Sequence, residues 1–260
     1  GLEPLLVNQR IRKAIVRNRA LRLPVPRTLP RLLAGATISG VARRGKYLLI
    51  DCGAGTLVLH LGMSGRLWVV DSATPPEPHD HFDLALENGA VVRLRDPRRF
   101  GLVLWCKGDP LRHALLANIG PEPFATDFDG AWLHRVTRSR SAAIKQVLMD
   151  SHVVAGIGNI YANEALFRAG IHPGRTARRI GMKRYELLAA KIRETLELAI
   201  GAGGSSLRDY VGSDGLAGNF QSQFTVYGRA GQPCQRCGTL IREIRQGQRS
   251  TFYCPRCQRC

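Results

Sequence analysis

The chain has 260 residues, 44% of them hydrophobic, and no apolar run approaches the roughly 18 residues that a membrane span needs. This composition excludes a disordered tail, and the length allows one large or two ordinary cores. Lys and Arg total 38 against 20 Asp and Glu, a formal net charge of +18. A surplus spread along a folded chain favours a long nucleic-acid groove, with a solubilising surface as the alternative. The first ten residues lack the apolar stretch of a signal peptide, so we expect a cytoplasmic protein.

The first hundred residues are predicted to be rich in β-strands. Short runs that alternate between apolar and polar residues are separated by turn signals, and Glu87-Asn88-Gly89 is a strong hairpin turn. Strands are expected at residues 46–51, 56–61, 81–86, 90–95 and 102–105. This pattern predicts a β-sandwich or barrel.

The character of the chain changes after Gly120-Pro121-Glu122-Pro123, where helical periodicity begins. Helices are predicted at residues 141–149, 159–169 and 183–200, the last with Leu188, Ile192 and Leu196 on one face. Residues 205–224 are rich in Gly, Ser and Asp and suggest a long loop. We therefore expect three domains, at residues 1–120, 121–224 and 225–260.

Four cysteines near the C-terminus form the strongest local motif. Cys234-x-x-Cys237 and Cys254-x-x-Cys257 are separated by 16 residues, a spacing at which four thiolates close a tetrahedral zinc site. One structural zinc ion is expected, because about thirty residues cannot bury a core unaided. Arg249 lies near the tip of the hairpin between the two pairs and is the residue that this hairpin could present to a partner.

Three further segments carry candidate binding residues. Gly156-Ile157-Gly158-Asn159 directly precedes a helix, so Asn159 is either a plain N-cap or part of a phosphate site. The segments at residues 60–65 and 96–101 place Met63, Arg98 and Phe100 in glycine-flanked turns. In a DNA-binding protein such residues wedge between bases and replace an extruded one. From the residues alone, Met63 and Phe100 in the core with Arg98 on the surface is the favoured interpretation.

The motifs occur together in an order that resembles the family of formamidopyrimidine-DNA glycosylase and endonuclease VIII, with the fuller match to the former. The matching segments are RRGKYLLID, HLGMSG, HDHFDL, DPRRFG, IGPEP, AIKQVLMD, VAGIGNIYANEALF, AGIHP, SDGLAGNF, VYGR and TFYCPRCQ. The resemblance implies an α+β multidomain fold with an N-terminal β-sandwich, a helix–two-turn–helix domain and a C-terminal four-cysteine zinc ribbon. It also implies a monomer that excises oxidised purines, especially 8-oxoguanine and formamidopyrimidines, from double-stranded DNA and cleaves the abasic site by β- and δ-elimination.

The resemblance also assigns roles to individual residues. Met63, Arg98 and Phe100 would fill the void left by the flipped base. Lys46 would hold backbone phosphate and donate a proton in β-elimination, while Arg249 would grip phosphate and assist δ-elimination. The remaining DNA contacts would come from His79, Arg140 and Asn159, and residues 205–224 would hold the loop that closes over the flipped base.

The chain differs from the family at the N-terminus. Family members begin with Pro-Glu-Leu-Pro-Glu-Val-Glu after removal of the initiator Met; the proline amine is the nucleophile and the glutamate manages protons. The chain with the sequence above begins at Gly1-Leu2-Glu3-Pro4, about a dozen residues into the family sequence by motif register. In this form its glycosylase activity is expected to be weak or absent. A trimmed or misassigned start is favoured, because Lys46, Arg98, Asn159 and Arg249 are present.

Three alternatives to an active repair enzyme stay open at this point. The chain could be a non-catalytic relative that only binds damaged DNA, or the missing segment could simply destabilise the first helix and the sandwich beneath it. Net charge and the four cysteines alone would also fit a zinc-ribbon transcription or RNA factor.

Overall fold

The computed structural model describes residues 1–204 and 219–259. The chain divides into two compact units, residues 1–117 with 203–219 and residues 118–202 with 220–260. The expected lesion loop at residues 205–224 therefore falls largely outside the described residues. Within the described ranges, no helix is both long and apolar enough to cross a membrane.

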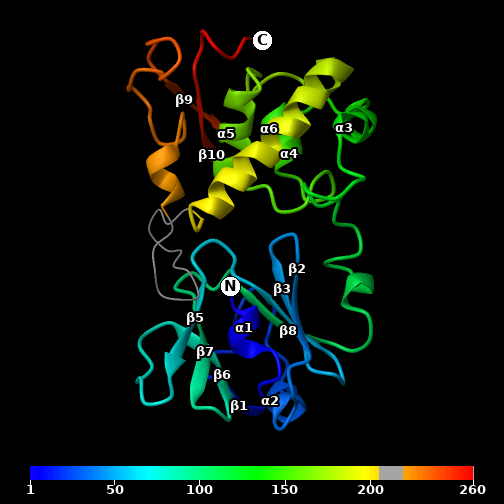
Figure 1. The fold of residues 1–260 in the computed structure, drawn as a ribbon, viewed down its shortest axis with the longest axis vertical. Helices are drawn as coiled ribbons and strands as arrows, with labels where there is room; N and C mark the ends of the chain where they lie inside the picture. Colours follow the sequence, from blue (N-terminus) through cyan, green and yellow to red (C-terminus); the bar gives the residue numbers. More distant parts are fainter. Residues whose placement is uncertain (205–218, 260) are drawn as a thin grey trace. The chain divides into compact units, whose positions relative to one another are not determined.

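The first unit is built from two antiparallel four-stranded sheets (Figure 1). One sheet has the strand order β1-β6-β7-β5 and the other β2-β3-β4-β8. Their bounds are β1 Ile11–Val16, β2 Gly40–Arg44, β3 Tyr47–Asp51, β4 Thr56–His60, β5 Arg66–Asp71, β6 Asp80–Leu86, β7 Ala90–Arg95 and β8 Leu102–Cys106. Two short helices, α1 Glu3–Leu6 and α2 Leu29–Leu33, and the 3-10 turn η1 Pro110–Arg112 complete the unit.

The two sheets bury their apolar faces in one shared core. Ile50 and Leu57 from one sheet and Phe82 and Val92 from the other belong to a single buried cluster. This arrangement confirms the predicted β-sandwich. All five predicted strands are present, with bounds that differ by at most one residue. The strands β1, β2 and β5 were not predicted, because arginine and lysine interrupt the apolar alternation in each segment or its flank.

The second unit packs four helices around its own core and carries the C-terminal hairpin (Figure 1). The elements are α3 Gly130–Thr137, α4 Ile144–Leu148, α5 Asn159–Arg168, α6 Met182–Gly201, the 3-10 turns η2 Ala177–Arg179 and η3 Phe220–Gln223, and the strands β9 Arg242–Gln246 and β10 Arg249–Tyr253. The predicted apolar stripe of α6 is confirmed, since Leu188 and Ile192 are fully buried. Helix α3 was not predicted from the sequence.

The helix α4 is shorter than the predicted 141–149. Its N-cap Ala143 has an extended backbone and pairs with Thr176 in an isolated antiparallel bridge. The N–H of Ile144 then donates to the carbonyl oxygen of Arg175 at 2.8 Å. This pairing with a distant segment holds the first three predicted residues out of the helix, a tertiary effect that local periodicity does not contain.

A buried carboxylate on α5 fixes the segment that leads into the C-terminal hairpin. Glu164 has no exposed surface, and its oxygens accept the backbone N–H groups of Thr225, Val226 and Tyr227 at 3.0–3.1 Å. The guanidinium of Arg168, one turn later, pairs with the same carboxylate at 2.8 Å. Three otherwise unpaired N–H groups and a buried charge are thus satisfied together.

Replacing this carboxylate should destabilise the second unit. We expect Glu164→Gln to lower the free energy of unfolding by about 3 kcal/mol. The neutral amide leaves the charge of Arg168 unpaired, and its NH2 group faces backbone N–H groups that also need an acceptor. The helix signal in circular dichroism, followed in urea, measures the change. Glu197→Gln, an exposed position on α6, is the matched control and should leave stability unchanged. Equal stability of both variants would contradict the role given to Glu164.

Candidate functional site

Two loops of the first unit lie against each other and expose apolar side chains. A Cβ on Gly62, which has φ +64°, would come within 2.6 Å of the carbonyl carbon of Phe100, so only glycine permits this contact. Met63 is 54% exposed and Phe100 is 50% exposed. The Arg98 guanidinium lies 5.8 Å from the Phe100 ring. The favoured expectation that Met63 and Phe100 are core residues was therefore wrong, while Arg98 does lie on the surface.

Lys46 lies in the turn between β2 and β3, where its side chain is exposed. It borders a cavity of about 390 Å³. The rest of that cavity is mostly apolar and is lined by Gly1, Leu2, Arg43, Tyr47, Leu48, Leu59, Leu61 and Leu67. Lys46 thus places an exposed cation at the border of a mostly apolar cavity, where it can meet an incoming anion.

His60, at the end of β4, is a neighbour of this cation that the sequence analysis did not identify. Its Nδ1 accepts the N–H of Gly62 at 2.9 Å, and its ring lies 4.8 Å from that of Tyr47. Burial, with the charges of Arg22 and Lys46, lowers the pKa of His60 to about 4. The imidazole is therefore neutral near pH 7 and available to shape the loop that carries Met63. The sequence signal that could have identified His60 is its position at the start of the glycine-flanked segment 60–65.

The two expected backbone contacts His79 and Arg140 belong to different units. His79 is exposed and has a positive φ of 73°. Arg140 forms an ion pair with Asp150 at 2.6 Å, which lowers the pKa of that carboxyl and offsets part of the arginine charge. The structure thus gives Arg140 a partner within its own unit, and its role toward DNA stays a prediction.

Asn159 and the start of β10 lie side by side in the second unit. Asn159 is the first residue of α5 and Gly158 is the N-cap, so of the two alternatives for Asn159 the plain N-cap is wrong. Instead, its side-chain amide donates to the carbonyl oxygen of Ser250 at 3.1 Å. Arg249, the next residue toward the N-terminus, is exposed. This hydrogen bond places the backbone at the start of β10, next to Arg249, beside the N-terminus of α5.

A buried lysine supports this contact and was missed by the sequence analysis. Lys145 is 1% exposed, and its Nζ donates to the same Ser250 carbonyl at 3.0 Å and to Thr251 Oγ1 at 2.6 Å. Burial and the charge of Arg249 lower its pKa to about 8. The only sequence signal was a lysine within the otherwise apolar helical run of α4.

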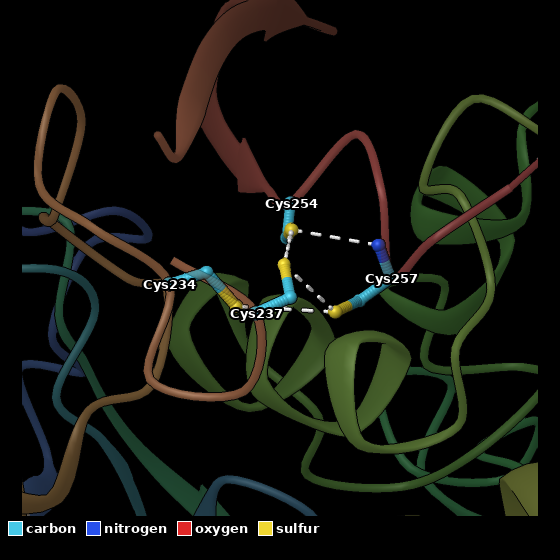
Figure 2. Close-up of side chains that lie close together, drawn as sticks. All are labelled: Cys234, Cys237, Cys254 and Cys257. Atoms are coloured by element: carbon cyan, nitrogen blue, oxygen red, sulfur yellow. Dashed lines mark hydrogen bonds between the residues drawn. The ribbon is translucent and has the colours of Figure 1, made fainter. Parts of the chain in front are cut away.

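The four cysteines of the C-terminal segment converge on one point (Figure 2). Their Sγ atoms all lie within 4.8 Å of one another, with Cys234–Cys257 at 3.9 Å and Cys237–Cys254 and Cys237–Cys257 at 3.5 Å. A tetrahedron with zinc–sulfur bonds of about 2.3 Å has edges of about 3.8 Å. The cysteine cluster therefore fits one zinc ion.

The four thiols differ in their surroundings. Hydrogen bonds from Thr239 lower the pKa of Cys237 to about 6, whereas burial and the neighbouring thiols raise the pKa of Cys257 to about 12. A divalent ion would hold all four groups as thiolates in spite of this difference. The hairpin's own core is small, with Val226, Ile241 and Phe252 packed on Phe167 of α5, so metal ligation supplies much of its stability.

Removing one ligand should release the metal. Cys237→Ser is expected to reduce the zinc content to less than about one tenth of an ion per chain and to lower the melting temperature of the hairpin by several degrees, because three thiolates do not close the site. Zinc is measured with a chromogenic chelator after protein digestion. Cys106→Ala, at a buried thiol in the first unit, is the control and should keep a full ion. Zinc retention in Cys237→Ser would contradict this assignment.

The partly buried His60 should make the first unit sensitive to acid. Between its ordinary value of 6.5 and about 4, the unfolded chain binds a proton at His60 that the folded chain does not. The free energy of unfolding therefore falls as the pH falls through this window. The loss should be about 1–2 kcal/mol, since part of the ring is exposed.

The comparison with His60→Gln isolates this effect. Urea unfolding of the wild-type chain and the variant at several pH values in this window gives the free energy of unfolding as a function of pH. This free energy should depend less steeply on pH in the variant. Identical slopes would mean that His60 does not titrate in the window.

Comparison with known proteins covers both units. Residues 1–103 match the model of the formamidopyrimidine-DNA glycosylase N-terminal domain, residues 119–211 the model of its H2TH domain, and residues 231–259 a zinc finger found in FPG and IleRS. The third match identifies the four-cysteine segment as a zinc finger, consistent with one structural zinc ion.

Individual relatives match over the full length of the chain. A formamidopyrimidine-DNA glycosylase of Alkalilimnicola ehrlichii is 55% identical over 265 residues, covering 100% of this chain and 96% of the relative. One from Syntrophotalea carbinolica is 52% identical with the same coverage.

Solved structures agree with these relatives. The MutM (Fpg) protein of Thermus thermophilus superimposes with a TM-score of 0.89 at 38% identity, covering 99% of this chain and 94% of that one. A Lactococcus lactis Fpg in complex with DNA containing an abasic site superimposes with a TM-score of 0.92 at 35% identity, covering 100% and 96%. The chain therefore belongs to the formamidopyrimidine-DNA glycosylase family.

Proposed function

We propose that the protein is a base-excision-repair glycosylase that removes oxidised purines, including 8-oxoguanine and formamidopyrimidines, from double-stranded DNA and then cleaves the abasic site. The observation that carries this proposal is the pair of adjoining loops that expose Met63, Arg98 and Phe100. Large apolar side chains that are half exposed on loops gain free energy when they leave water for a base stack. Family membership adds the chemistry that these loops would serve.

The three side chains suit the gap left by an extruded base. Met63 and Phe100 are apolar wedges from neighbouring loops, and Arg98 stacks near the Phe100 ring while keeping five N–H donors for the edge of an unpaired base. Unstacking a base costs a few kcal/mol, which such a wedge offsets by refilling the stack. The two loops would thus hold the duplex open while the damaged base is outside it.

Each unit carries cations that suit a DNA backbone. Lys46 would bind phosphate and donate a proton in β-elimination, and Arg249 would assist δ-elimination. Asn159, at the N-terminus of α5, would bind phosphate beside Arg249, where the helix dipole favours an anion. His79 and Arg140 would add backbone contacts, and the net charge of +18 would attract the DNA.

The nucleophile in this proposal is the N-terminal proline of the family, which precedes Gly1 in the family register. Its secondary amine would attack the sugar C1′, displace the damaged base and form a Schiff base. Elimination from that intermediate would cleave the strand. The adjacent glutamate of the same segment would act as the general acid and base.

The DNA complexes among the structural neighbours support the substrate class. The Lactococcus lactis protein has been solved with DNA that contains an abasic site and with DNA that contains Fapy-dG. We propose the same class of ligand, damaged duplex DNA, for this chain.

Borohydride trapping tests the proposal, because it reduces the Schiff base to a stable bond between protein and DNA. The chain that begins at Gly1 and a version extended by the family's Pro-Glu segment are each incubated with an 8-oxoguanine duplex, with an undamaged duplex as control. We expect trapping of the extended version on the damaged duplex alone, at a yield at least about a hundredfold above that of the unextended chain.

Two different results would point elsewhere. If neither version is trapped but both prefer an abasic-site duplex, the protein binds damage without processing it. If both prefer undamaged DNA or RNA, a zinc-ribbon nucleic-acid factor replaces the repair enzyme.

A further inference from the structure

A buried carboxylate lies behind the exposed loops of the first unit. Asp96 follows the last residue of β7 and has no exposed surface. The same segment carries Arg98 and Phe100, to which the proposed function gives roles, whereas Asp96 has none in it. A carboxyl side chain withdrawn from solvent needs hydrogen-bond partners that offset its burial.

Each oxygen of Asp96 holds one of the two loops. Oδ1 accepts the hydroxyl of Ser64 at 2.7 Å, and Ser64 is the neighbour of Met63. Oδ2 accepts the backbone N–H of Gly101 at 2.6 Å, and Gly101 is the neighbour of Phe100. The carboxylate therefore joins two segments that are more than thirty residues apart in the sequence.

The backbone of Asp96 makes three further bonds. Its N–H donates to the carbonyl oxygen of His79 at 3.0 Å, and its own carbonyl oxygen accepts the N–H of Arg99 at 3.1 Å. The same carbonyl oxygen lies 2.9 Å from Nε2 of His81. His79 and Arg99 both have positive φ, 73° and 57°, a conformation that non-glycine residues hold only when the surroundings fix it.

The hydrogen bonds of one residue thus hold the backbone of His79 and the sequence neighbours of Met63, Arg98 and Phe100. We infer that Asp96 is the positioning residue that sets Met63, His79, Arg98 and Phe100 in a single arrangement suited to a damaged base pair. This inference rests on the proposed function for the identity of the DNA. Asp96 acts through geometry, since a misplacement of about 1 Å can reduce the rate of a reaction about a hundredfold.

Three variants separate positioning from simple stability. Asp96→Ala removes both side-chain bonds, and Ser64→Ala removes only the bond to the Met63 loop. Asp96→Asn is the conservative variant, because its oxygen can still accept from Gly101 and its amide can donate to Ser64 Oγ. Asp83→Asn is the matched control: Asp83 is a buried carboxylate of β6 that binds Arg17 and Arg93 and holds neither loop.

Two measurements on the full chain need no catalysis. Amide hydrogen exchange reports how firmly residues 61–65 and 97–101 are held. The ratio of dissociation constants for an undamaged duplex and a tetrahydrofuran abasic-site duplex reports how well the loops recognise damage. We expect Asp96→Ala to speed exchange in both loops and to reduce the ratio, each about tenfold, with affinity for undamaged DNA within about twofold. Ser64→Ala should show a smaller loss, and Asp96→Asn should restore most of it.

The inference is overturned if Asp96→Ala and Ser64→Ala lower the melting temperature but leave loop exchange and the binding ratio unchanged. It is equally overturned if Asp83→Asn changes the ratio as much as they do. If Asp96→Ala does not fold, Ser64→Ala decides between these outcomes. If the wild-type chain does not prefer the abasic duplex, the proposed function fails, and loop exchange alone then shows whether Asp96 holds the loops.

Discussion

Buried carboxylates that accept backbone N–H groups are the interaction on which the irregular parts of this protein depend. Regular strands and helices satisfy their own backbone groups, but a loop cannot, and an unpaired N–H removed from water is costly. Glu164 solves this problem for the segment that enters the zinc finger, and Asp96 solves it for the loop that carries Phe100. In both places an acidic side chain fixes a segment whose own residues have no regular structure.

The two units present their candidate functional residues in different ways. In the first, a β-sandwich provides a rigid edge from which two short loops expose apolar residues. In the second, Lys145 and Asn159 both donate to the Ser250 carbonyl, which holds the zinc finger against α4 and α5. The zinc ligands stabilise the finger itself, whereas these hydrogen bonds fix the backbone at Ser250, next to Arg249. The metal thus contributes to the folding of the zinc finger, and the polar contacts contribute to its position on α4 and α5.

The sequence could predict those parts of the fold that depend on local pattern. Alternation and an Asn-Gly turn identified β6 and β7, and cysteine spacing identified the zinc site, because neighbouring residues encode both. Burial of Met63 was predicted wrongly, since an apolar residue is usually buried, and the close approach of Gly62 to the Phe100 backbone joins segments that are distant in the sequence. Lys145 and His60 were missed for a related reason: their surroundings come from residues distant in the sequence.

The helix α5 packs against two neighbours at once, which restricts its sequence. Its residues 162–167 are all buried, six in succession, whereas an ordinary surface helix leaves one side in water. Ala165 and Leu166 pack into the helical core, and Phe167 packs into the zinc finger. Such a helix has almost no position at which sequence can drift freely. Its mutational tolerance should be low over most of its length, and divergence among relatives should accumulate elsewhere, on the exposed side of α6.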